Sequence, residues 1–120
     1  MSGGLKGFLQ RTIGIGVKSR FEPTSDELAG EMERDEVTVL DIRSPGEYES
    51  GHIPGARLVP PAQLNPETLG IDKDTPVVCY CASGGRSEYA RGTLERAGFT
   101  NVRNFGGIGR WTGALETGSG

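Results

Sequence analysis

Hydrophobic residues along this chain gather in short uninterrupted runs, separated by polar segments rich in glycine and proline. The runs at 37–42 and 76–81 are apolar and contain several β-branched residues, which is typical of strands buried on both faces. Shorter apolar runs at 57–59 and 101–105 predict two further strands. None of these runs approaches the roughly 18 to 20 apolar residues of a membrane-spanning helix.

Helical segments are expected between these strands. Thr24 and Glu27 have the spacing of a capping box and predict a helix that extends to about Arg34. A second helix over residues 85–97 has apolar residues on one stripe and ends at Gly98, a common C-terminal stop. Single helical turns are expected at 47–49, within 62–70 and after Gly107.

Strands that alternate with helices predict a parallel sheet covered on both faces, so the expected fold class is a small three-layer α/β domain. A chain of 120 residues fits one domain, which we place at residues 22–115. The 20 glycines are an excess, but they follow no Gly-X-Y period, which excludes a collagen-like chain.

The charge is unevenly distributed along the chain. Residues 1–21 carry four basic and no acidic side chains, whereas the rest carries nine basic and sixteen acidic ones. Such an arm can contact nucleic acid or an anionic membrane, but a solvated, flexible arm is the simpler interpretation, so neither is expected as a partner. Residues 116–120 are expected to form a flexible tail. The arm's apolar stretch is too short and too interrupted by glycine for a signal peptide, so we expect a cytoplasmic location.

The two cysteines, Cys79 and Cys81, lie two residues apart at the end of an apolar run. In an extended strand their Cα atoms would be about 6.6 Å apart, near the upper limit for a disulfide, so we expect free thiols in a reducing compartment. One histidine and one Cys-x-Cys pair do not supply the four ligands of a typical zinc site, so neither a metal nor another cofactor is expected. Cys79 lies inside the strand and is interpreted as a core residue.

Cys81 stands at a strand end, where a loop of small residues leads into a helix. Parallel α/β sheets bind ligands outside the carboxyl ends of their strands, and loop amides together with a helix N-terminus attract negative charge there. A thiol in that position would have a lowered pKa and react as a thiolate. A purely structural Cys81 is the alternative, but it would need neither the glycines nor the arginine of the loop. The residues expected to hold the sulfur are Ala82, Ser83, Gly84, Gly85 and Arg86, with Arg86 adding a fixed positive charge.

Three segments in this order resemble the single-domain rhodaneses, a family of thiosulfate-type sulfurtransferases. VLDIRSPGEY at 39–48, continuing into GHIPGA at 51–56, is similar to the family's N-terminal signature. CASGGRS at 81–87 resembles its active-site loop, and NFGGIGRW at 104–111 resembles its closing segment. Together these motifs extend the resemblance over about residues 22–115.

The resemblance implies a five-stranded parallel sheet flanked by helices, and catalysis through a persulfide. Cys81 would be the nucleophile that takes a sulfane sulfur from thiosulfate or from a persulfide donor. Cyanide or a thiol, on a small molecule or on an acceptor protein, would then remove the sulfur. The amides of residues 82–86 would hold the persulfide meanwhile. Asp41, Arg43 and Glu47 match family positions that brace the site, and an ion pair that joins two loops is an equal interpretation of Asp41 and Arg43.

Other functions remain open beside the sulfurtransferase. Ala82 and Ser83 are neutral, and Ala82 lacks the cation that many thiosulfate-preferring members carry at that position, which keeps a persulfide donor open. The intact Cys81 and Arg86 argue against a non-catalytic interaction module but do not exclude a non-catalytic sulfur carrier with a dedicated partner. Four residues separate Cys81 from Arg86, as in sulfurtransferases, whereas the related phosphatases and arsenate reductases have five. The remaining notable side chains, assigned to packing, are His52 and Trp111.

Overall fold

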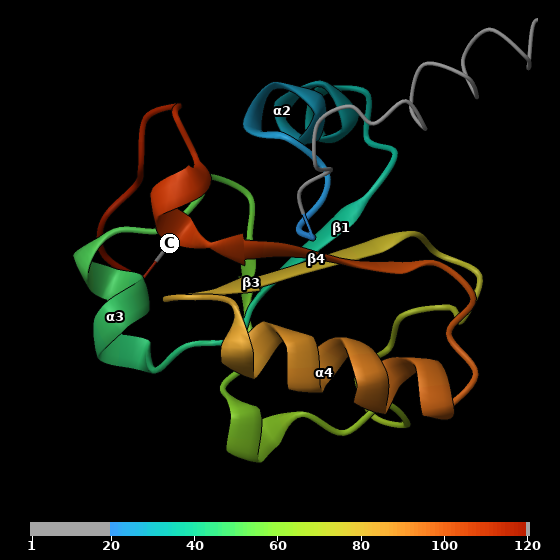
Figure 1. Cartoon of the computed structure of the whole chain (residues 1–120). Helices are drawn as coiled ribbons and strands as arrows, with labels where there is room; N and C mark the ends of the chain where they lie inside the picture. Colours follow the sequence, from blue (N-terminus) through green and yellow to red (C-terminus); the bar gives the residue numbers. More distant parts are fainter. Residues whose placement is uncertain (1–19, 120) are drawn as a thin grey trace, which may run out of the picture.

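The structure is a computed structural model that describes residues 20–119. Of the arm expected at 1–21, Arg20 and Phe21 lie within this range and the rest lies outside it. The sheet is built from β1 (Thr38–Asp41), β2 (Arg57–Leu58), β3 (Val77–Cys81) and β4 (Val102–Gly107). The strands are parallel and stand in the order β2-β1-β3-β4, so the two longest apolar runs lie side by side in the centre (Figure 1).

The expectation of a five-stranded sheet is wrong for the described residues, which form four strands. Each strand expected from the hydrophobic pattern is present, and the fifth had come from the family resemblance alone. The segment leading into the first helix approaches β4, where the Glu22 amide donates a hydrogen bond to the Asn104 carbonyl at 2.9 Å. Pro23 follows, and because proline has no N–H it cannot extend this contact into a ladder.

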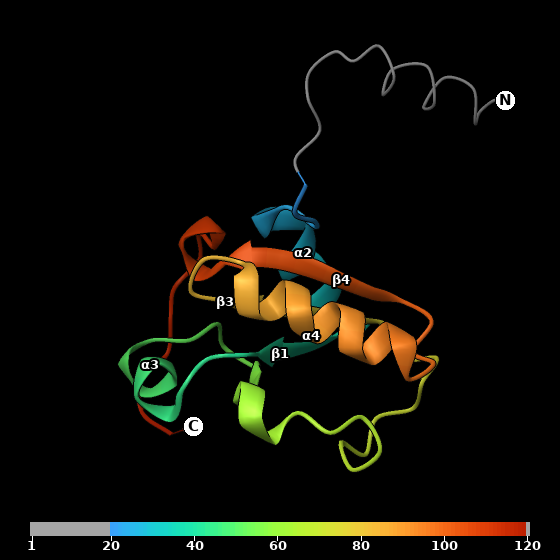
Figure 2. The ribbon, with the colours of Figure 1, turned by 60° about the horizontal axis from the view of Figure 1, so that its bottom comes forward.

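Helices cover both faces of the sheet, as expected for three layers. The helices are α2 (Ser25–Glu33), α3 (Pro45–Ser50) and α4 (Gly85–Arg96), with the 3-10 helices η1 (Pro61–Gln63) and η2 (Ile108–Arg110). Figure 1 shows α2 and α4 on opposite sides of the sheet, and Figure 2 shows α4 in front of β1, β3 and β4. Among the helices of residues 20–119, none is long and apolar enough to cross a membrane.

Local signals explain where these helices begin. The Thr24 side chain accepts from the Glu27 amide, and the Glu27 carboxylate accepts from the Thr24 amide, so the expected capping box is present. Ser44 and Glu47 form a second box at the start of α3. The turn expected within 62–70 is instead the 3-10 helix that starts one residue earlier, since proline fits the first position of a helix.

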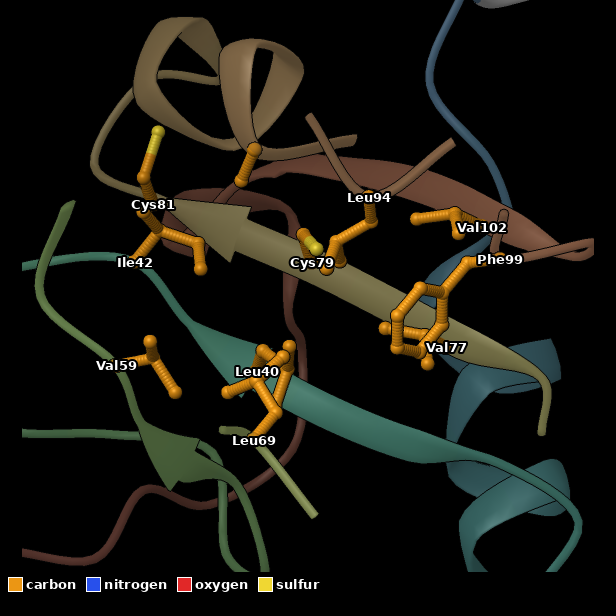
Figure 3. Packing of buried hydrophobic residues seen from close by; sticks show 11 residues of the cluster. Leu40, Ile42, Val59, Leu69, Val77, Cys79, Cys81, Leu94, Phe99 and Val102 are labelled. Atoms are coloured by element: carbon orange, nitrogen blue, oxygen red, sulfur yellow. The ribbon is translucent and has the colours of Figure 1, made fainter. Parts of the chain in front are cut away.

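Two apolar clusters fill the spaces on either side of the sheet, because alternate residues of β3 point to opposite faces. Cys79 and Cys81 belong to the cluster beneath α4, where Figure 3 shows Cys79 next to Leu94. Val78 and Tyr80 belong to the cluster beneath α2. Burial, together with the nearby Cys81, raises the pKa of the Cys79 thiol to about 12, so this thiol stays neutral in the core.

A buried polar network ties the carboxyl end of β1 to the chain that follows it. The Asp41 carboxylate accepts two hydrogen bonds from the Arg43 guanidinium, at 2.8 and 2.7 Å, and one from the Tyr80 hydroxyl at 2.6 Å. Arg43 also donates to the Gly51 carbonyl, and the Tyr80 hydroxyl accepts from the Ile53 amide. Because the ion pair is buried, these extra hydrogen bonds are needed to offset its desolvation.

Replacing Tyr80 by Phe should lower the free energy of unfolding by roughly 1–3 kcal/mol, because the buried Ile53 amide and Asp41 carboxylate each lose a partner. Tyr89, which is 69% exposed, offers a matched control. Tyr89→Phe removes the same hydroxyl and should change the free energy of unfolding by less than about 0.5 kcal/mol. Urea unfolding followed by circular dichroism compares the variants, and equal effects at both positions would contradict a stabilising role for the network.

Candidate active site

The candidate active site lies at the carboxyl ends of the strands, the edge at which parallel α/β domains bind ligands. β3 ends at Cys81, and α4 begins four residues later at Gly85. Between them Gly84 adopts a φ of 103°, a left-handed conformation that favours glycine and turns the loop back toward the sulfur. The loop that the sequence singles out therefore stands at the expected end of the sheet.

Hydrogen-bond donors from the loop and from the first turn of α4 surround the Cys81 sulfur. The Gly84 amide donates at 3.0 Å, the Ser87 amide at 3.4 Å and the Ser87 hydroxyl at 3.3 Å. Cys81 is only 1% exposed, so these donors replace the water that a thiolate would otherwise require. Amides at a helix N-terminus also carry partial positive charge, so the arrangement favours a negative sulfur.

The pKa of Cys81 is lowered from the ordinary value of a thiol. Burial is the largest single effect and acts in the opposite direction, because a low-dielectric surrounding disfavours the thiolate. The hydrogen bonds from the Ser87 hydroxyl and from the amides of Ser87, Gly84 and Ser83 together outweigh it. Cys79 and Cys81 therefore differ in chemistry although they lie on the same strand, since the pKa of Cys81 is lowered and that of Cys79 is raised.

Ser87 and Asn104 contribute to the site, although the sequence pattern does not mark them as site residues. The Ser87 hydroxyl lies between the Cys81 sulfur and the Asn104 side-chain oxygen, at 3.3 and 2.8 Å. Its single hydrogen can be donated to one of them at a time, and a charged thiolate is the stronger acceptor. The same Asn104 oxygen accepts from the Gly106 amide at 2.9 Å, and its nitrogen donates to the Gly84 carbonyl at 3.2 Å. Both residues lie inside motifs that carry the family resemblance, which is the signal that points to them.

The positive charge of Arg86, expected beside the sulfur, is directed at a carboxylate of α3. Its terminal nitrogens donate to the two Glu47 carboxylate oxygens at 3.0 and 3.2 Å. The Arg86 guanidinium, and after it the Ser44 amide, lower the pKa of Glu47 to about 2. Glu47 therefore stays ionised at neutral pH and matches the charge of Arg86.

The three supporting residues link the signature segment to the loop. Asp41 and Arg43 form the buried ion pair that holds the chain after β1 in place. The hydrogen bond that Arg43 donates to Asp41 holds the pKa of Arg43 above its usual range, so the guanidinium stays charged. Glu47 extends this connection across to Arg86, at the start of α4.

His52 and Trp111 lie in packed surroundings. The His52 ring stacks on Tyr48 with 3.6 Å between centroids, and its Nδ1 lies 2.8 Å from the Tyr48 carbonyl oxygen. Trp111 packs against the cluster beneath α2, and its Nε1 donates to the Ala114 carbonyl. Within residues 20–119, no group of three or more His, Cys, Asp and Glu side chains is placed to hold a metal ion.

Ser87→Ala removes the hydroxyl donor, so the pKa of Cys81 should rise and the pH profile of alkylation by iodoacetamide should move to higher pH. The alkylation rate at neutral pH should fall on the order of fivefold, since hydrogen bonds to charged groups are stronger than neutral ones. Ser87→Thr keeps the hydroxyl and is the control. Peptide mapping verifies that the label is on Cys81 and not on Cys79. A wild-type profile in Ser87→Ala would show that the hydroxyl does not stabilise the thiolate.

Comparisons with known sequences lead to one family. The profile of the Rhodanese-like domain matches residues 24–114. The chain is 40% identical to YqhL of Bacillus subtilis over 79 residues, which cover 65% of this chain and 63% of YqhL. It is 31% identical to the thiosulfate sulfurtransferase GlpE of Pseudoalteromonas translucida over 86 residues, which cover 71% of this chain and 82% of GlpE.

Solved structures show the same fold. A rhodanese with anions from E. coli matches with a TM-score of 0.63 at 30% identity, over 68% of this chain and 99% of that one. The Alr3790 protein from Anabaena sp. matches with a TM-score of 0.71 at 28% identity, over 78% of each chain. The chain spans 63% of the length of YqhL and 44% of that of YrkF, a proposed sulfur carrier protein of the same species. Because the family profile covers most of its length, this chain belongs to the rhodanese-like family, whose relatives include sulfurtransferases.

Proposed function

We propose that this chain is a sulfurtransferase that carries sulfur on Cys81 as a persulfide. The set of donors around a sulfur that is 1% exposed is the observation that supports this most directly. Donors that stabilise negative charge on sulfur serve both the attacking thiolate and the persulfide that results. The relative GlpE, which is named a thiosulfate sulfurtransferase, points to the same class of reaction.

The transfer consists of two displacements at sulfur. The Cys81 thiolate attacks the outer sulfur of a donor R–S–SH, so that a bond from Cys81 Sγ forms as the donor's S–S bond breaks. The donor's proton passes to the departing thiolate, which leaves as R–SH, and Cys81–S–S⁻ remains; with thiosulfate, sulfite leaves instead. An acceptor thiolate or cyanide then attacks the outer sulfur, the S–S bond to Cys81 breaks, and the Cys81 thiolate is regenerated. Because one bond to sulfur replaces another in each step, no external oxidant or reductant is required.

The charges at the loop favour a persulfide over thiosulfate as the donor. Ala82 and Ser83 are exposed and neutral, and Arg86 is already paired with Glu47. Thiosulfate carries two negative charges and gains little from a cation whose charge is matched by a neighbouring carboxylate. A persulfide carries one negative charge or none, so it depends less on an additional cation.

A sulfur carrier with a dedicated acceptor protein is the second candidate, because the relative YrkF is a proposed sulfur carrier protein. The Cys81 persulfide is common to both candidates, which differ in whether a small thiol or cyanide can discharge it efficiently. Both agree with a cytoplasmic location, where reducing conditions keep Cys79 and Cys81 as the free thiols seen in the structure.

Incubation with thiosulfate or with a low-molecular-weight persulfide should add the mass of one sulfur atom to the intact protein, and cyanide or dithiothreitol should remove it. Cys81→Ser should take up no sulfur, because its nucleophile is missing. Cys79→Ser should still take it up and is the matched control, since its thiol is buried and neutral. Intact-mass spectrometry measures all three, and failure of the wild type to gain sulfur from either donor would overturn the proposal.

Ala82→Lys should improve the use of thiosulfate by placing an unpaired cation in the loop that follows Cys81. We expect the KM for thiosulfate to fall on the order of tenfold, because the added cation attracts the dianion. The KM for a persulfide donor should fall by less than about twofold. Thr100→Lys adds the same charge before the start of β4, at the opposite end of the sheet, and should change neither. Steady-state kinetics with both donors would contradict this account if the two KM values moved together.

A further inference from the structure

Phe21 packs against the active-site loop from a position outside residues 24–114, the segment that the family profile matches. A Cβ atom placed on Gly84 would stand 2.8 Å from Phe21 Cζ and 3.0 Å from Cε1. A Cβ atom placed on Gly106 would stand 2.8 Å from Phe21 Cγ and 2.9 Å from Cδ2. The ring therefore spans two glycines, one in the loop after β3 and one in β4.

Both glycines take part in the hydrogen bonds around the sulfur. The Gly84 amide donates to Cys81 Sγ at 3.0 Å, a shorter distance than those of the two Ser87 donors. The Gly106 amide donates to the Asn104 side-chain oxygen, which also accepts from the Ser87 hydroxyl. Gly84 and Gly106 have φ values of 103° and 99°, a conformation that side chains rarely adopt, and the ring occupies the space that the absent side chains leave.

The chain that directly follows the ring is fixed to β4 and η2. The Glu22 amide donates to the Asn104 carbonyl at 2.9 Å, and Figure 1 shows the segment before α2 passing beside β4. Arg110 donates to the Pro23 carbonyl at 3.2 Å, and its guanidinium lies 5.9 Å from the Phe21 ring centroid. Because these contacts hold the backbone directly after Phe21, the ring is a fixed support behind the loop.

We propose that Phe21 is a positioning residue for the Cys81 thiolate. The ring restricts movement of Gly84, so the Gly84 amide stays directed at the sulfur. Without the ring, space opens behind the loop, and a hydrogen bond weakens steeply once its geometry departs from the preferred range. A role of Phe21 in sulfur transfer rests on the proposed function. Its effect on the ionisation of Cys81 does not depend on that function.

The test compares the pH profile of Cys81 alkylation in full-length Phe21→Ala, Phe21→Leu and wild-type protein. Phe21→Ala should move the profile to higher pH and slow alkylation at neutral pH on the order of threefold, because one hydrogen bond to the thiolate is weakened. Phe21→Leu keeps part of the apolar volume and should restore most of the rate. If Phe21→Ala does not fold, Phe21→Leu is the test variant, because the loss of part of the ring volume should still move the profile to higher pH by a smaller amount, and a wild-type profile would then overturn the proposal.

Phe99→Leu is the matched control, because Phe99 is a buried phenylalanine beyond the far end of α4. It should lower the melting temperature without moving the alkylation profile. A wild-type profile in Phe21→Ala, or an equal shift in Phe99→Leu, would overturn the positioning role. A shift confined to the Phe21 variants would support the positioning role. This role would stand even if the wild type accepted sulfur from no donor, because that failure would reject only the proposed function.

Discussion

Cys81 keeps its sulfur almost entirely out of water, and a thiolate there depends on hydrogen bonds that the protein has to supply. The Gly84 and Ser87 groups that supply them are held in place by β4 and by the chain before α2. The pairing of β3 with β4 shifts between Cys79 and Tyr80, so that Phe105 is passed over between Asn104 and Gly106. Such irregularities reorient side chains, and here Asn104 faces the Ser87 hydroxyl.

Two ion pairs hold the segments near this sulfur. The Asp41–Arg43 pair is buried, and the Tyr80 hydroxyl donates a further hydrogen bond to Asp41. The Glu47–Arg86 pair lies nearer the surface. Both arginines therefore face carboxylates, which leaves the neutral amides and the Ser87 hydroxyl as the groups that stabilise a negative sulfur. A site of this kind is suited to holding one negative charge on sulfur more than to attracting a dianion.

Local sequence signals predicted most of the fold. The Thr24–Glu27 box and the four apolar runs each act over a few residues, and the corresponding helix and strands appear near the expected positions. A spacing of two residues also placed Cys79 and Cys81 on one face of β3, and only their positions inside the strand and at its end distinguished them in the sequence. Their pKa values differ because only Cys81 meets the donors of the following turn, a contact that depends on the loop conformation at Gly84.

Periodicity and neighbours along the chain are enough to predict the order of the elements, the position at a strand end of the cysteine that we propose as the nucleophile, and the length of its loop. Which side chains meet in the site depends instead on the tertiary structure. Arg86 meets a carboxylate 39 residues away, and Ser87 meets an amide 17 residues away. The fifth strand was expected from the resemblance and the positive charge of Arg86 beside the sulfur from the loop sequence, and both depend on which segments pack together. Phe21 carries no local signal of its role, since its contact with Gly84 and Gly106 exists only once the chain has folded.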